Sequence, residues 1–368
     1  MAVDILALAA PGVRDLQPYQ PGKSIEELEC EYGIRDAVKL ASNENPLGAS
    51  PRAITAARET LNDAMRYPDG NGSYLKTALA SKLGIATNQI TLGNGSNDIL
   101  ELVTRAFVSP DNEVIYSEHA FAVYPIVTRA VGACAVVTKA RNWGHDLQAM
   151  RKSVTARTRV VFIANPNNPT GTWLPVDELE EFISGLPDHV LIVVDEAYFE
   201  YVQEPGYSDT VKWVGRFPNL LVTRTFSKIH GLAGLRIGYG IAGPALTNVL
   251  NRVRQPFNVN SVALAAARAA LDDQRHVERS MQLNRDGMRQ LTEAFDAMGL
   301  GYIPSAGNFV CLDMGRPAGP VYQALLIHGV IVRPVANYGM PNHLRVTVGL
   351  PEENGRFIGA LKKILGEG

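Results

Sequence analysis

The sequence predicts an α/β fold with a large domain, in which a mostly parallel seven-stranded sheet lies between helices, and a smaller α+β C-terminal domain. Two observations predict it. Between residues 89 and 241 short apolar runs alternate with amphipathic segments, which is typical of a helix-covered parallel sheet. After about residue 244, two long helical segments precede several short strands. A length of 368 residues suits about two domains.

The large domain should contain strands at residues 89–92, 113–116, 135–138, 160–164, 190–194, 220–223 and 236–241, because each is a short apolar run. Helical spacing falls between them at 99–108 and 176–186. In the C-terminal part, the pattern predicts helices at 263–271, 277–298 and 352–365, and strands at 308–313, 330–334 and 343–350. We therefore expect an N-terminal arm over 1–38, the large domain over 39–250 and the small domain over 251–368.

Composition narrows the class of partner. Lys+Arg total 35 and Asp+Glu total 37, a net charge of −2, so no electrostatic field favours nucleic acid or an anionic membrane. No apolar run approaches the ~18 residues of a membrane helix. The three cysteines form no C-x-x-C pair, so we expect no disulfide framework, no metal site and a reducing cytoplasm. Small molecules and a second copy of the chain remain as partners.

Residues 225–229 read Thr-Phe-Ser-Lys-Ile and follow a predicted strand. Lys228 is the candidate catalytic residue, because a lysine amine can bond covalently to an aldehyde such as that of pyridoxal 5'-phosphate (PLP) and can later move a proton. A solvated lysine after a strand is the alternative. Three upstream segments favour the catalytic interpretation.

The first of these segments, residues 195–198, reads Asp-Glu-Ala-Tyr and closes the apolar run 190–194. A buried carboxylate needs a cationic partner, and a protonated pyridine nitrogen would be one for Asp195. Tyr198 could donate a hydrogen bond to the phenol oxygen of PLP. Asp195 could instead cap the next helix.

The second segment, residues 165–171, reads Asn-Pro-Asn-Asn-Pro-Thr-Gly, and Asn168 could donate to the same phenol oxygen. An ordinary turn is an equally good interpretation of this composition. The third segment, residues 93–98, reads Gly-Asn-Gly-Ser-Asn-Asp between a strand and a helix, an arrangement that directs backbone N–H groups at an anion. It predicts a phosphate site with contacts from Ser96, Asn97, Ser227 and Arg236.

Three further residues are candidates. Phe121 follows the predicted strand 113–116 and could stack on the pyridine ring, or simply pack in the core. Arg333 and Arg345 lie in predicted strands, where guanidinium groups suit bidentate binding of carboxylate or phosphate. Either arginine could instead face solvent.

This ordered set of motifs resembles the fold-type-I PLP aminotransferases of class I/II over nearly the whole chain. Within them the chain is most similar to the histidinol-phosphate aminotransferases. The segments that carry this likeness are 13–19 (Val-Arg-Asp-Leu-Gln-Pro-Tyr), 40–46 (Leu-Ala-Ser-Asn-Glu-Asn-Pro), 67–70 (Tyr-Pro-Asp-Gly), 233–236 (Ala-Gly-Leu-Arg) and 344–349 (Leu-Arg-Val-Thr-Val-Gly).

The resemblance implies a homodimer in which Tyr67 reaches the PLP phosphate of the neighbouring subunit. It also implies that Tyr19, on the N-terminal arm, covers the substrate, with Asn45 among the substrate-binding residues. Arg345 would take the α-carboxylate of glutamate, and Arg333 and Arg345 would hold the phosphate of histidinol phosphate. Some relatives have tyrosine where this chain has Phe121, so the hydroxyl of that position is lost here.

The resulting prediction is a transaminase that interconverts L-histidinol phosphate and 2-oxoglutarate with imidazole acetol phosphate and L-glutamate. An aromatic aminotransferase, or a phosphothreonine-type decarboxylase of the same fold, is the alternative within PLP chemistry. A dinucleotide-binding dehydrogenase that uses residues 93–98 is the alternative outside it, but it leaves Lys228, Asp195 and Asn168 unexplained.

Overall fold

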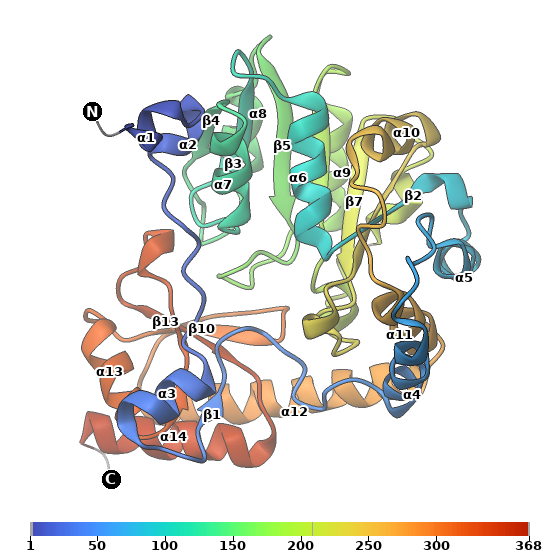
Figure 1. Ribbon diagram of the computed structural model, residues 1–368. Helices are drawn as coiled ribbons and strands as arrows, with labels where there is room; N and C mark the ends of the chain where they lie inside the picture. The colour runs from blue at the N-terminus through green and yellow to red at the C-terminus, as the bar shows by residue number, and fades with distance from the viewer. Residues whose placement is uncertain (1–2, 208, 367–368) are drawn as a thin grey trace.

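A seven-stranded sheet forms the centre of the computed structural model, which describes residues 3–207 and 209–366 (Figure 1). Its strand order is β2-β8-β7-β6-β5-β3-β4, and β8 runs in the direction opposite to the other six strands. The mostly parallel sheet predicted from the sequence is therefore confirmed. The strands are β2 (Ile90–Gly93), β3 (Glu113–Ser117), β4 (Cys134–Thr138), β5 (Thr158–Ala164), β6 (Leu191–Asp195), β7 (Leu220–Thr225) and β8 (Gly238–Ala242).

Helices cover both faces of this sheet because successive strand residues point to opposite sides. Along β5, Val160 and Phe162 pack with α6, α7 and α10, whereas Val161 and Ile163 pack with α4, α5, α9 and α11. The helices around this sheet are α4 (Pro51–Thr60), α5 (Ser73–Leu83), α6 (Ser96–Phe107), α7 (Val123–Ala130), α8 (Leu147–Lys152), α9 (Val176–Ser184), α10 (Pro244–Val253) and α11 (Ser261–Leu271). Short 3-10 helices are η1 (Leu61–Asp63), η2 (Thr87–Gln89), η3 (Phe199–Tyr201), η4 (Thr210–Trp213), η5 (Ala233–Leu235) and η6 (Ala336–Tyr338).

A second core lies below the large sheet in the view of Figure 1. It contains a four-stranded sheet, β12-β13-β10-β9, and a parallel pair, β1-β11. The predicted strand at 330–334 is divided between these two sheets. The elements are β1 (Val38–Lys39), β9 (Tyr302–Ile303), β10 (Phe309–Asp313), β11 (Val330–Ile331), β12 (Arg333–Pro334), β13 (His343–Thr347), α12 (Gln274–Ala297), α13 (Gly319–Ile327) and α14 (Pro351–Leu365).

The N-terminal segment runs along both parts of the molecule. Its helices, which the sequence analysis did not predict, are α1 (Ile5–Leu8), α2 (Pro11–Arg14) and α3 (Ile25–Tyr32). The pairing of β1 with β11 attaches this segment to the small domain. Helix α11, which follows the predicted boundary at residue 250, packs on α4 of the large domain. The domain boundaries remain predictions.

One predicted element is wrong at its start. Arg236 does not lie in a strand; it follows η5 in a left-handed backbone conformation (φ 58°), and β8 begins at Gly238. The apolar Ile237 beside it made the run look extended. None of the helices within 3–207 and 209–366 is long and apolar enough to cross a membrane.

Candidate active site

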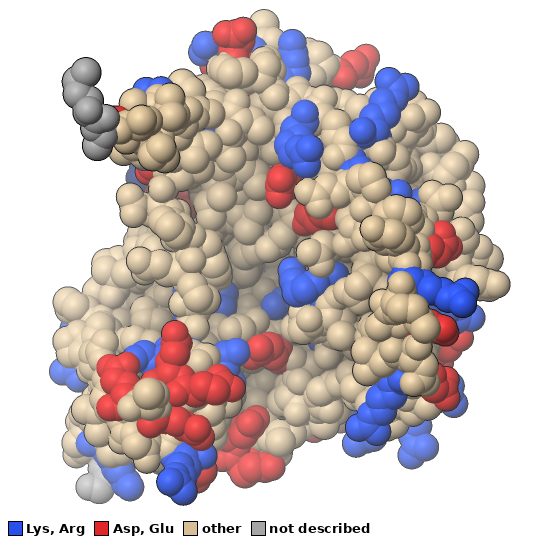
Figure 2. All heavy atoms as spheres, in the orientation of Figure 1, with Lys and Arg blue, Asp and Glu red and all other residues tan. Residues whose placement is uncertain are grey.

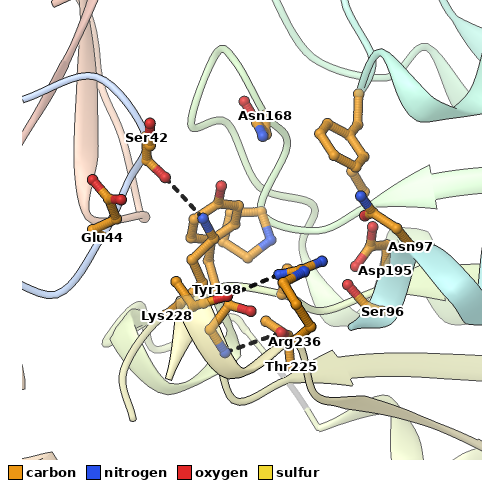
Figure 3. Close-up of a pocket in the computed structure, with 16 residues that line it drawn as sticks. Ser42, Glu44, Ser96, Asn97, Asn168, Asp195, Tyr198, Thr225, Lys228 and Arg236 are labelled. Carbon is orange, nitrogen blue, oxygen red and sulfur yellow. Dashed lines mark hydrogen bonds between the residues drawn. The ribbon is translucent and has the colours of Figure 1, made fainter. Parts of the chain in front are cut away.

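A cavity of about 250 Å³ lies where β2, β5, β6 and β7 give way to loops or helices (Figure 3). Figure 3 shows Ser42 and Glu44 on one side, Ser96, Asn97 and Asp195 on the other, and Lys228, Tyr198 and Arg236 between them. All the predicted cofactor-binding residues except Tyr67 line this cavity: Ser96, Asn97, Phe121, Asn168, Asp195, Tyr198, Ser227, Lys228 and Arg236. In Figure 2, Lys and Arg side chains border a hollow between the two domains, whereas acidic side chains gather over α3.

Lys228 stands three residues beyond β7 and points into the cavity. Its Nζ donates a hydrogen bond to the backbone oxygen of Ser42 at 3.0 Å. Burial, reinforced by the charge of Arg345, lowers the pKa of this amine to about 7. A substantial neutral fraction near pH 7 is what a nucleophilic amine or a general base requires. Sequence reasoning missed Ser42, although it lies in the segment 40–46 that we singled out.

Asp195 ends β6, and only 5% of it is exposed. Its Oδ1 accepts from Thr223 Oγ1 at 3.0 Å, and its Oδ2 accepts from Tyr124 Oη at 3.2 Å. No Lys, Arg or His nitrogen of the described residues lies within 4.0 Å, and burial raises the pKa of this carboxyl to about 6. The carboxylate therefore lacks the cation that a buried charge requires. Tyr124 and Thr223 were missed as site residues.

The first turn of α6 faces the same cavity through Ser96 and Asn97. The residue before it, Gly95, has φ 84° and gives the helix no side-chain cap. A Cβ on Gly95 would lie 2.5 Å from Nη2 of Arg236, so the guanidinium packs directly on this backbone. Free N–H groups, the positive helix end and a guanidinium form an anion site.

Tyr198 and Asn168 approach the cavity from the loops after β6 and β5. The Tyr198 hydroxyl accepts from Asn43 Nδ2 at 2.8 Å, and burial raises the pKa of its phenol to about 12, so it stays protonated. Asn168 Oδ1 accepts from Arg345 Nη1 at 2.5 Å, which leaves the amide N–H groups of Asn168 to donate. Phe121 lines the cavity and meets Tyr124 edge to face, with ring centroids 6.0 Å apart.

Two arginines occupy paired positions on the small sheet. Arg333 on β12 is the register partner of Arg345 on β13, and both are less than a tenth exposed. Arg345 Nη2 donates to Ala41 O at 2.7 Å, while its buried Nε has no hydrogen-bond partner among the described residues. Arg333 Nη2 donates to Gln20 O at 2.8 Å. The pair retains donors for an anion.

Five predicted site residues are not part of the cavity lining: Arg333 and Arg345, described above, and Tyr19, Asn45 and Tyr67. Tyr19 stands over Arg333, with 5.8 Å between the guanidinium carbon and the ring centroid, and it is half exposed. Asn45 Nδ2 donates to Ile229 O and Ser280 Oγ, so its amide braces the loop after Lys228 against α12. Tyr67 is 83% exposed and stacks on Phe257 with centroids 4.8 Å apart.

These features fit PLP. A carboxylate without a cation suits a pyridinium nitrogen, the α6 terminus suits a phosphate, and a neutral lysine amine suits an aldehyde. The fold and this cavity together define a fold-type-I PLP enzyme. The model of the aminotransferase class I and II family matches residues 35–361, and the chain belongs to that family.

Curated relatives match over the whole chain. It is 60% identical over 370 residues to histidinol-phosphate aminotransferase 2 of Pseudomonas fluorescens (strain Pf0-1), covering 100% of both chains. It is 61% identical to histidinol-phosphate aminotransferase 1 of Nitrosococcus oceani, covering 98% of this chain and 97% of that one. A solved histidinol-phosphate aminotransferase of Sinorhizobium meliloti in complex with PLP superposes with a TM-score of 0.89 at 28% identity, covering 97% of each chain. The chain is thus a PLP-dependent transaminase.

Proposed function

We propose that the enzyme transfers the amino group of L-histidinol phosphate to 2-oxoglutarate, giving imidazole acetol phosphate and L-glutamate in histidine biosynthesis. The curated relatives that match the full chain carry the name of this activity, which supports the proposal.

The observation that carries the substrate assignment is the paired position of Arg333 and Arg345 on β12 and β13. L-Histidinol phosphate has a phosphate ester where an amino acid has its carboxylate, and 2-oxoglutarate has two carboxylates. A pair of fixed guanidinium groups can serve both, because each presents planar donors to an oxyanion. Tyr19, over Arg333, would close the arm across the bound substrate.

The other residues around the cavity have separate roles in cofactor binding and proton transfer. PLP, when bound, serves as an electron sink for the bond broken at the substrate's Cα and carries the amino group between the two half-reactions. Lys228 would hold the aldehyde carbon of PLP, and its amine would move the proton of the substrate's Cα. Asp195 holds the ring nitrogen protonated, and Tyr198 and Asn168 donate to the phenol oxygen. Ser96, Asn97, Ser227 and Arg236 bind the phosphate, and Phe121 covers the ring.

Addition of one amino donor without a keto acid tests the substrate. L-Histidinol phosphate should abolish the visible band of the lysine-bound cofactor, because the amino group moves onto the cofactor in a half-reaction. L-Phenylalanine should do so far less effectively. Loss of the band with phenylalanine alone would reassign the enzyme as an aromatic aminotransferase, and release of carbon dioxide would indicate a decarboxylase.

The Arg333→Gln variant sharpens the assignment. It should raise the concentration of L-histidinol phosphate needed for half-maximal bleaching by ~10-fold or more, since a charged hydrogen bond contributes about 1.5–3 kcal/mol. The value for L-phenylalanine, which has no phosphate, should change much less. Equal losses for the two donors would argue against a phosphate site at Arg333.

We further propose that the enzyme is a homodimer in the cytoplasm. Several large apolar side chains are exposed on and beside α4, η1, α5 and the loop before α11: Ile54, Leu61, Met65, Tyr67, Tyr74 and Phe257. Exposed apolar side chains gathered on neighbouring elements are typical of subunit interfaces. Tyr67, which stacks on Phe257, is one of them, and this suits a role in the partner's site. Three free cysteines suit a reducing compartment. Sedimentation of the purified protein should give about twice the chain's 39.9 kDa.

A further inference from the structure

Asn43 lies between two residues of the cavity lining and was not among the predicted site residues. Its neighbours Ser42 and Glu44 both line the cavity, and Ser42 O accepts from Lys228 Nζ. Asn43 itself is 1% exposed and has a left-handed backbone conformation (φ 56°), which asparagine adopts more readily than most residues. A buried polar side chain in such a conformation calls for specific partners.

Those partners fix the orientation of the amide. The backbone N–H of Asn43 donates to Thr347 Oγ1 at 2.9 Å, and that hydroxyl in turn donates to Asn43 Oδ1 at 3.1 Å. Because Oδ1 accepts this proton, the NH₂ group must point the other way. It donates to Tyr198 Oη at 2.8 Å.

The direction of this last bond determines what Tyr198 can do. A phenol has one proton to donate and lone pairs to accept with. Since Asn43 already donates to the oxygen, the phenol proton cannot point at Asn43. Asn43 is the hydrogen-bond partner of Tyr198 Oη within the described part of the chain, so the proton is left for the cavity.

We propose that Asn43 is a positioning residue that orients the Tyr198 hydroxyl so that its proton is donated to the phenol oxygen of bound PLP. The inference rests on the role proposed above for Tyr198. Asn43 also links the N-terminal segment to the small domain beside the cavity. Its partner Thr347 belongs to β13, and Asn308, just before β10, donates to Asn43 O at 3.1 Å.

The test is a pH titration of the visible band in protein loaded with PLP, without substrate. A donor to the phenol oxygen disfavours protonation of the lysine-bound cofactor, so it lowers the pH midpoint of the band. Asn43→Gly removes the amide but tolerates the left-handed backbone. We expect this variant to raise the midpoint of the titration by about one pH unit. It should also weaken the binding of PLP to the cofactor-free protein, which a fluorescence titration measures.

A double-mutant cycle with Tyr198→Phe separates positioning from general damage. If Asn43 acts through the tyrosine hydroxyl, Asn43→Gly should leave the midpoint of the Tyr198→Phe protein unchanged. Asn142→Gly is the matched control, because Asn142 is also left-handed (φ 51°) but is exposed. It should leave the midpoint of the unmodified protein unchanged.

Two results would overturn the proposal: an unchanged midpoint in Asn43→Gly, or a shift of the same size in the Tyr198→Phe background. If Asn43→Gly does not fold, Thr347→Val provides the same test, since it frees the amide to turn and should raise the midpoint by a smaller amount. The experiment uses no substrate, so an incorrect substrate assignment would leave its outcome intact. An unmodified protein that binds PLP without a visible band would count against Lys228 instead.

Discussion

Burial sets the protonation of the two central side chains of the cavity, and it acts on them in opposite directions. It lowers the pKa of Lys228 to about 7 and raises that of Asp195 to about 6. In both cases the low-dielectric surroundings disfavour the charged form. The cavity therefore holds an amine with a substantial neutral fraction near pH 7 and a carboxyl group whose charged form has no paired cation among the described residues.

The lowered pKa of Lys228 predicts how the rate of PLP binding depends on pH. Only the neutral amine attacks an aldehyde, so the rate at which cofactor-free protein captures PLP should rise with pH through a midpoint near 7. Stopped-flow absorbance at constant ionic strength measures this rate. Lys228→Ala should form no lysine-bound band at any pH and should lose turnover while it keeps its fold. A midpoint near the ordinary lysine value of 10.5, or a tenth of normal turnover in the variant, would contradict the assigned role.

The raised pKa of Asp195 predicts how the unfolding free energy depends on pH. Its folded pKa of about 6 lies above the ordinary value of 3.8, so the fold favours the protonated carboxyl. Cofactor-free protein should therefore lose on the order of 3 kcal/mol of unfolding free energy as the pH rises from about 4 to above 6. Asp195→Asn does not titrate and should lack this loss.

Urea unfolding of both proteins at several pH values measures the difference. A changed hydrogen bond between the amide and Tyr124 adds an offset that does not depend on pH, so only the pH-dependent part is compared. With saturating PLP at neutral pH, the unmodified protein should have a higher unfolding free energy than Asp195→Asn, because only the carboxylate pairs with a pyridinium. If the difference in unfolding free energy between the two proteins does not change between pH 4 and 7, the pKa of Asp195 is not raised by burial.

At the scale of elements, the site is made by the ends of parallel strands and by one helix. β5, β6 and β7 run parallel, so the loops that follow them meet at one edge of the sheet. β2 runs antiparallel to β8, which is itself antiparallel to β7, so β2 ends at the same edge and delivers the start of α6 there. If one of these strands ran in the opposite direction, the loop that follows it would lie at the opposite edge of the sheet.

The approach of Gly95 to Arg236 makes the start of α6 sensitive to a single methyl group. Gly95→Ala should displace the guanidinium, because a Cβ would lie 2.5 Å from Nη2, and should raise the dissociation constant of PLP by at least ~10-fold. Gly84→Ala is the matched control: Gly84 also has a positive φ (67°), but a Cβ there meets no atom of the described residues within 4 Å.

The control should cost about 1 kcal/mol of stability for its backbone conformation and leave PLP affinity unchanged. Absorbance titration gives the affinities, and thermal unfolding gives the stabilities. Equal PLP affinities for the two variants would show that the contact with Arg236 does not shape the anion site.

At the scale of the whole molecule, the cavity is assembled from segments far apart in the sequence. Ser42 and Glu44 come from the N-terminal segment, and Arg345 reaches Asn168 from the small domain. Tyr67 does not line the cavity of its own chain and is 83% exposed. The proposed homodimer would bring it to the cavity of the other subunit.

Mixing two impaired variants tests this arrangement. A hybrid of one Lys228→Ala subunit and one Tyr67→Ala subunit has one unaltered site only if each tyrosine serves the other subunit. Refolding the two variants together should therefore restore activity well above that of either homodimer, when PLP is limiting. No gain from confirmed hybrid dimers would place Tyr67 outside the partner's site. The same assay with Lys228→Ala alone sets the background.

The sequence by itself determined the sheet, the order of its motifs and nine of the residues that line the cavity. Lys228, Asp195 and Asn168 follow apolar runs, and local periodicity identifies such runs because the pleat and the helix have fixed repeats. The connection rules of parallel sheets then bring the ends of those runs together. Family resemblance added Tyr67, Tyr19 and Asn45, whose roles remain predictions.

Only the tertiary structure decided which neighbours hold those side chains. Tyr124 and Thr223 approach Asp195, and Asn43 approaches Tyr198, through contacts between residues that are 28 to 155 positions apart. The left-handed turn at Arg236 and the division of residues 330–334 between two sheets depend on the same long-range packing. Periodicity carries no information about such contacts, because it records which face of an element is buried and not what buries it.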